Sequence, residues 1–251
     1  MINIKTKEQI KIMAKGGEIL SFTMWEVGKA IKEGVTELEI DVLAEKLISE
    51  KGGEPGFKKV EGYKHTICVS TNDVVVHGIP TGYKFKTNDV VGIDCGVFYK
   101  GFHTDMSETF VVGASETPEV HKFLETGKLA LQKGIEQAVI GNHVGNISKI
   151  IQDIVEVKSG YSVVRSLVGH GVGRQLHEDP EVPGYLVGKI DKTPLLKEGM
   201  VIAVEIIYNM GGSELMLDSD GWTLRTKDKS LSGLFERTIA ITQNGPQILT
   251  K

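Results

Sequence analysis

The chain of 251 residues is 40% apolar and 25% charged, which is enough for one large domain with a real core. Its net charge of -4 and its pI near 6.0 exclude the basic surface that DNA or RNA binding requires. No apolar stretch is long enough to span a membrane, and the N-terminus lacks the apolar segment of a secretory signal, so we expect a cytoplasmic protein.

Two helices are predicted near the N-terminus. Thr6-Lys7-Glu8-Gln9 fits a capping box and begins a helix that could run to about residue 32, although Gly16-Gly17 weakens its middle. Thr36-Glu37-Leu38-Glu39 is a second capping box, and its helix is expected to stop before Gly52-Gly53. The chain therefore opens with a helical pair.

Two further helices are expected in the second half. Thr117 caps a helix with Pro118 at its first position, and that helix is predicted to end near Gly141. Another follows over about residues 147–157. The β-like runs are residues 66–70, 74–76, a hairpin over 89–113, 161–168, 201–208 and 234–242.

The predicted elements repeat. Helix, helix, strand, His-Gly and two acidic strands occur before residue 113, where they supply His77, and again after residue 117, where they supply His170. We therefore predict an α+β fold: one domain over residues 1–251, with two similar halves, 1–113 and 114–251, packed around a polar site.

Five residues define that site, because each lies in or beside an apolar run where an unpaired charge is costly. They are Asp94, Asp105, His170, Glu205 and Glu236. Four carboxylates and an imidazole on buried strands require a cation. Such a ligand set suits hard or borderline divalent metals.

The hairpin brings Asp94 and Asp105 together in two alternative registers. A turn centred on Tyr99-Lys100 places them directly opposite each other, and a turn centred on Lys100-Gly101 shifts the pairing by two but keeps both on one face. Like charges so placed are destabilising without a cation. The alternative is a pair of solvent-facing aspartates on an edge hairpin.

Glu205 interrupts a run that is typical of a strand buried on both faces, from Val201 to Ile207. A glutamate there needs a partner. The alternative to a metal is an ion pair with a cation such as Arg237. Glu236 taken alone could belong to an ordinary exposed pair at a strand start.

His170 lies between two glycines and opens a loop that holds His177. A lone histidine is more often packed or solvated than a ligand, and two histidines seven residues apart in a loop form no helical zinc motif. His65, His103, His121 and His143 lack such a context, and we expect them on the surface or in loops. Cys68 and Cys95 are expected to be buried thiols, and Cys95 should point away from Asp94.

The chain resembles the type I methionine aminopeptidases, over essentially its whole length. The segments that carry the resemblance are residues 76–80 (VHGIP), 94–105 (ending GFHTD), 169–174 (GHGVGR), 176–180 (LHEDP), 221–223 (GWT) and 227–232 (KDKSLS). The resemblance implies the pita-bread fold, with an antiparallel sheet that cradles a dinuclear metal site.

The same resemblance implies roles for nine residues. Asp94, Asp105, His170, Glu205 and Glu236 would bind two divalent ions (Co, Mn, Fe, Zn or Ni), with Asp105 and Glu236 bridging them. His77 would assist the scissile amide, and His177 would hydrogen-bond the substrate carbonyl. Glu205 would also shuttle the proton, while Tyr63 and Trp222 would line the methionine pocket.

The sequence departs from the family at four positions: Phe57, Val60, Leu176 and Ile206, the last of which stands where a proline usually follows the glutamate ligand. We therefore expect hydrolysis to be kept and the shape of the pocket to differ. The expected function is removal of initiator methionine from nascent chains by a monomer, with transient ribosome association. The alternatives are an Xaa-Pro peptidase on the same fold and a non-catalytic binding protein.

Overall fold

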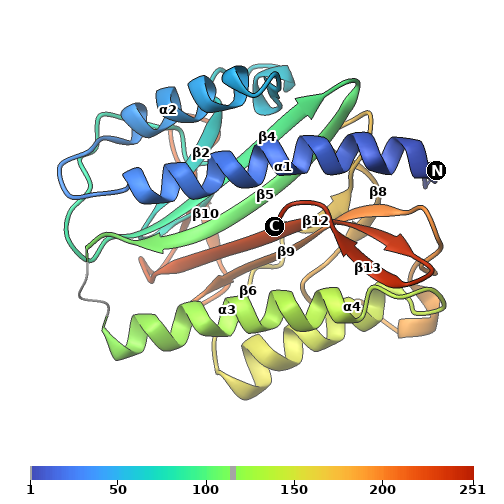
Figure 1. The fold of residues 1–251 in the computed structure, drawn as a ribbon. Helices are drawn as coiled ribbons and strands as arrows, with labels where there is room; N and C mark the ends of the chain where they lie inside the picture. Colours follow the sequence, from blue (N-terminus) through green and yellow to red (C-terminus); the bar gives the residue numbers. More distant parts are fainter. Residues whose placement is uncertain (1, 114–116) are drawn as a thin grey trace.

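The computed structural model describes residues 2–113 and 117–251 (Figure 1). The boundary that the sequence places between residues 113 and 114 adjoins the three residues outside this description. The division into one domain with two similar halves stays a prediction.

The helices match the predicted ones closely at their N-termini. Thr6 and Thr36 both form the predicted capping boxes, and the Thr117 side chain accepts a hydrogen bond from the Val120 N–H. The helices are α1 (Lys7–Ala30), α2 (Glu37–Glu50), η1 (Phe57–Lys59), α3 (Pro118–Glu136), α4 (Val144–Gln152), the π-helical η2 (Asp153–Lys158) and η3 (Ile190–Lys192).

Most of the strands join one antiparallel sheet. They are β1 (Glu54–Pro55), β2 (Ile67–Thr71), β3 (Val74–Val76), β4 (Val90–Tyr99), β5 (Phe102–Val111), β6 (Ser162–Val163), β7 (Gly169–Gly171), β8 (Glu178–Val182), β9 (Val201–Asn209), β10 (Leu215–Leu217), β11 (Leu224–Thr226), β12 (Ser232–Thr242) and β13 (Gly245–Ile248). The sheet runs β1-β4-β5-β12-β9-β7-β8, with β2 on β4, β6 on β9 and β13 on β12, while β10-β11-β3 form a second, smaller sheet.

The helices cover one face of the large sheet. In Figure 1, α1 lies over β4 and β5, with α2 beside it, and α3 lies over β9 and β12, with α4 beside it. Side chains alternate along a strand, so Ile93 and Cys95 of β4 pack under α1 and α2, and Val204 and Ile206 of β9 pack under α3 and α4. Asp94 and Glu205 are therefore left on the opposite face.

The strands β5 and β12 join the two parts of the sheet, and threonine hydroxyls take part in the joint. The backbone pairs there are Glu236 with Ser107 and Arg237 with Met106. On one side, Thr238 Oγ1 accepts from the Asp105 N–H at 2.8 Å and donates to the Asp105 carbonyl at 2.7 Å. On the other side, Thr109 Oγ1 bridges the N–H and the carbonyl of Leu234 in the same way.

Four predictions about these elements were wrong. The run over residues 161–168 forms a strand only at Ser162–Val163, and His170 lies within the short strand β7 rather than after a strand. Helix α3 ends at Glu136, five residues before Gly141. His103 lies on β5 and is only 5% exposed, because β5 passes through the sheet interior.

The glycines that weaken the prediction of α1 are explained by close packing. A Cβ at Gly17 would overlap the backbone carbonyl of Leu249, so α1 can approach the C-terminal segment only with glycine there. Within residues 2–113 and 117–251, no helix is long and apolar enough to cross a membrane.

Candidate active site

One row across four adjacent strands holds three acidic residues and Ser107. Asp94 of β4 pairs with Ser107 of β5, Ser107 pairs with Glu236 of β12, and Glu236 pairs with Glu205 of β9. Neighbouring strands lie about 4.8 Å apart, so carboxylates in such a row repel each other strongly. Asp105 lies two residues from Ser107 on the same face.

The hairpin adopts the second of the two predicted registers. Gly96 is opposite Asp105 and Asp94 is opposite Ser107, as a turn centred on Lys100-Gly101 requires. The two aspartates are thus diagonal neighbours on one face. The solvent-facing alternative is wrong, because Asp105 is 4% exposed and Asp94 lines an internal cavity.

The ion-pair alternative for the glutamates is also wrong. Arg237 points to the helix-covered face, where its guanidinium donates to the Glu108 carboxylate and to the carbonyls of Ser107 and Glu236. Glu236 is 1% exposed and Glu205 is half-buried at the cavity wall. Neither carboxylate is neutralised by this arginine.

His170 joins the acids from the neighbouring strand β7. Its Nδ1 lies 2.9 Å from the Gly171 carbonyl, which can only accept, so Nδ1 carries the proton and Nε2 keeps a free lone pair. Nε2 lies 3.9 Å from Asp105 Oδ2, and one ligand atom each from Asp105, His170 and Glu236 fall within 4.8 Å of one another. These three ligand atoms are close enough together to bind one metal ion.

Burial perturbs every titratable group here. It raises the pKa of Asp94 to about 7 and the pKa of Glu205, also affected by the Asp94 charge, to about 8. It raises the pKa values of Asp105 and Glu236 well above the ordinary range, with neighbouring acids adding to the effect. Burial lowers the pKa of His170 to about 4, so its imidazole is neutral at pH 7.

The donor set fits divalent metal ions. Asp94 Oδ1 and Glu236 Oε1 are buried and have no hydrogen-bond partner among the described residues. Buried carboxylate oxygens without a donor are costly, and a cation between them removes that cost. Oxygen ligands with one imidazole suit hard or borderline divalent ions.

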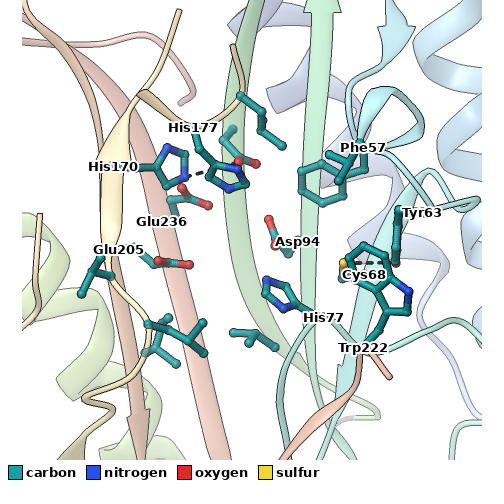
Figure 2. Close-up of a pocket in the computed structure, with 17 residues that line it drawn as sticks. Phe57, Tyr63, Cys68, His77, Asp94, His170, His177, Glu205, Trp222 and Glu236 are labelled. Carbon is teal, nitrogen blue, oxygen red and sulfur yellow. Dashed lines mark hydrogen bonds and ion pairs between the residues drawn. The ribbon is translucent and has the colours of Figure 1, made fainter. Parts of the chain in front are cut away.

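An apolar pocket adjoins the acids. The cavity has a volume of about 210 Å³, and Figure 2 shows His170, Glu205 and Glu236 on one side of it, with Asp94 towards the middle. The opposite side carries Phe57, Tyr63, Cys68 and Trp222, with Val60, Val76, Leu167, Val168, Leu176 and Ile207 completing the apolar lining.

The aromatic wall is rigid. The Tyr63 hydroxyl donates a hydrogen bond to the Ile67 carbonyl at 2.8 Å and accepts one from the Cys68 thiol at 3.1 Å. The Tyr63 ring meets Trp222 edge-on at 5.2 Å and Phe57 at 6.3 Å. The sequence did not predict that Cys68 belongs to this wall. Its only signal is the alternation of side chains along the strand, which puts Cys68 on the same face as Ser70.

Of the four positions that depart from the family, three reach the pocket. Phe57, Val60 and Leu176 line it, whereas Ile206 is fully buried in the core under α3 and α4. Ile206 also keeps its place opposite Phe235 in the β9–β12 ladder. The presence of isoleucine rather than proline at position 206 therefore affects the core beneath the sheet and not the pocket.

His77 and His177 flank the acids. His77 follows β3 with a positive φ of 55°, which turns its side chain into the cavity, and His177 stacks edge-on against His170 at 4.3 Å (Figure 2). Burial lowers the pKa of both imidazoles, and each also lies near another histidine. Both are therefore neutral at pH 7 and can donate one N–H.

Comparison with known proteins places this site in a family. The sequence profile of metallopeptidase family M24 matches residues 11–243. The chain belongs to metallopeptidase family M24. The fold implied by the resemblance, an α+β pita-bread fold with an antiparallel sheet, is thereby confirmed, as is the dependence on metal ions.

Similarity to other M24 proteins extends over the full chain. The chain is 43% identical to the methionine aminopeptidase of Clostridium perfringens, over 100% of this chain and 99% of that protein. It is 42% identical to methionine aminopeptidase 1 of Bacillus subtilis, with both chains fully covered. The methionine aminopeptidase structure from Thermotoga maritima superposes with a TM-score of 0.96 at 38% identity, with both chains again fully covered.

A structure with a different activity in its name shares the fold over part of its length. The prolidase from Pyrococcus furiosus superposes with a TM-score of 0.80 at 27% identity, and the match covers 99% of this chain but 65% of the prolidase.

Proposed function

We infer that this M24 member is a methionine aminopeptidase, a metal-dependent hydrolase that removes the initiator methionine from nascent proteins. The full-length similarity to methionine aminopeptidases from several bacteria carries this conclusion. The row of acidic residues beside an apolar pocket agrees with it, because such a site offers metal chemistry next to a binding site for one unbranched apolar side chain.

For the metal centre, we propose that two divalent ions are held by Asp94, Asp105, His170, Glu205 and Glu236. When bound, such a pair lowers the pKa of a water towards about 7 and polarises the substrate carbonyl. The chemical identity of the ions in the cell follows from availability rather than affinity, and Co, Mn, Fe, Zn and Ni all suit the donors.

Glu205 is the proposed proton shuttle. Glu205 of β9 is paired with Glu236 of β12, and the Glu205 side chain is half-buried and lines the cavity. It can accept the proton of the attacking water and pass it to the amine that leaves, acting as general base and then general acid.

His77 and His177 are proposed to hold the scissile amide. Both imidazoles line the cavity and are neutral, so each offers one N–H donor without a charge. His177 would donate to the carbonyl oxygen of the first residue, where negative charge develops, and His77 would bond the amide beside it. Donors aimed at the developing charge accelerate acyl transfer.

The methionine side chain is proposed to lie against Tyr63 and Trp222. Their rings, with Phe57 and Leu176, form an apolar wall on which a polarisable thioether packs well. Because Tyr63 is fixed by its bond to Ile67, the pocket selects by shape, and a β-branched side chain should fit poorly.

A substrate panel tests the function. Met-Ala-Ser, Met-Pro-Ser and Ala-Pro-Ser peptides would be supplied to the protein with Mn(II), Co(II), Fe(II), Ni(II) or Zn(II). We expect the fastest release from Met-Ala-Ser. Preference for Ala-Pro-Ser would identify the Xaa-Pro peptidase alternative, and hydrolysis of none with any metal would leave only the non-catalytic binding protein. A monomer and a transient ribosome contact remain part of this proposal.

A further inference from the structure

A second cavity continues from the first. Its volume is about 390 Å³, and it shares Val60, Leu176 and His177 with the pocket described above. The residues that belong to the second cavity alone are Lys59, Phe98, His103, Arg174 and Gln175. Because His177 lines both cavities, a substrate peptide bound at His177 can extend into both.

The second cavity is electropositive in an acidic protein. Lys59 and Arg174 line it, and none of its lining residues is acidic. Lys59 contacts Glu54 at 2.8 Å, but Glu54 is 62% exposed in its side chain, and such exposed pairs are weak. Arg174 lies over the Phe102 ring at 4.9 Å and pairs with no carboxylate in the part of the chain that the structure describes.

The floor of this cavity contains a buried polar group. His103 is 5% exposed, stacks on Phe98 at 4.8 Å, and its Nδ1 has no hydrogen-bond partner among the described residues. The ring therefore adds a polar edge to the lining of the cavity. A carboxylate entering here would meet two cations and an imidazole.

We propose that this second cavity binds an acidic side chain at the third residue of the substrate. The proposal rests on the proposed function, which places the first carbonyl at His177. An extended peptide advances about 3.3–3.6 Å per residue, so the third residue follows the small second residue out of the first pocket and past the shared wall of Val60 and His177. The enzyme would therefore favour Met-small-acidic sequences.

The test compares peptides that differ in one group. Met-Ala-Glu-Gly and Met-Ala-Gln-Gly, both amidated at the C-terminus, have nearly the same shape and differ in one charge. We expect kcat/KM to be about 3- to 10-fold higher for the glutamate peptide at low salt, mainly through KM, and the ratio to shrink at high salt. In the variant Lys59→Gln/Arg174→Gln, the ratio should fall to about 1.

A matched variant controls for net charge. Lys46→Gln/Lys122→Gln removes two exposed lysines on α2 and α3, outside both cavities, and should keep the preference for glutamate. Equal rates for the two peptides in the unmodified protein would refute this inference but not the proposed function. A ratio that stays the same in Lys59→Gln/Arg174→Gln would do the same. Failure to hydrolyse either peptide would overturn the proposed function and the inference with it.

Discussion

Replacing Glu205 by glutamine should stabilise the metal-free protein while abolishing hydrolysis. Burial and the nearby Asp94 charge raise the pKa of Glu205 from 4.5 to about 8, so the folded protein binds a proton that the unfolded chain releases between these values. The contribution of Glu205 to the free energy of unfolding is therefore fully present below about pH 4.5 and is lost as pH rises through this window. Glutamine keeps the shape and removes this loss.

The size of the effect follows from the same shift. At pH 7 the difference from 4.5 is about 2.5 pKa units at about 1.4 kcal/mol each, which bounds the gain at about 3.5 kcal/mol. The carboxylate is half-buried and water in the open cavity screens it, so we expect about 1–3 kcal/mol. Addition of Mn(II) should stabilise the original protein and have less effect on Glu205→Gln.

Urea unfolding followed by circular dichroism, with a chelator present, measures this at pH 5 and pH 8. Glu50→Gln, an exposed change at the end of α2, is the matched control and should leave stability nearly the same at both pH values. The reasoning is refuted if Glu205→Gln is no more stable than the original protein at pH 8, or if its gain is the same at pH 5.

Three further outcomes test the site and the fold. His177→Ala should lower kcat by about 100-fold or more by removing one donor to the developing oxyanion, which steady-state kinetics on Met-Ala-Ser would measure. Lys5→Met should cost about 3–5 kcal/mol, because Lys5 and Glu178 form an ion pair with side chains only 4% and 5% exposed; an unchanged urea midpoint would contradict this. Gly17→Ala should lower the melting temperature although alanine favours helices by about 1 kcal/mol, because its Cβ would overlap the Leu249 carbonyl; a raised melting temperature would show that the segment can move.

The acidic residues could be found from the sequence because they break apolar strands. Alternation along a strand also predicted that Asp94 and Cys95 face opposite ways, and the structure confirms this. The alternation of side chains predicts which face of the sheet a residue lies on, but not which residue of the next strand lies beside it. The row that joins Asp94 to Glu205 through Ser107 depends on pairings between strands about a hundred residues apart, which no local pattern encodes.

The apolar side of the pocket was harder to predict for the same reason. Phe57 lies in a single turn of helix and Trp222 in a loop, so neither has a periodic signal. Tyr63 and Trp222 were expected there only through the family resemblance. His103 was misplaced because its short polar context resembles a loop, whereas the pairing of β5 with β4 and β12 buries it.

The threonine-bridged joint between β5 and β12 has a consequence for motion. Because threonine hydroxyls replace some of the direct backbone hydrogen bonds here, we expect this joint to deform more easily than the continuous ladders on either side. Asp94 and Asp105 lie on one side of it, and Glu236 and Glu205 lie on the other. The joint can thus act as a hinge between the two pairs of proposed ligands, and metal ions held by both pairs would restrict its motion.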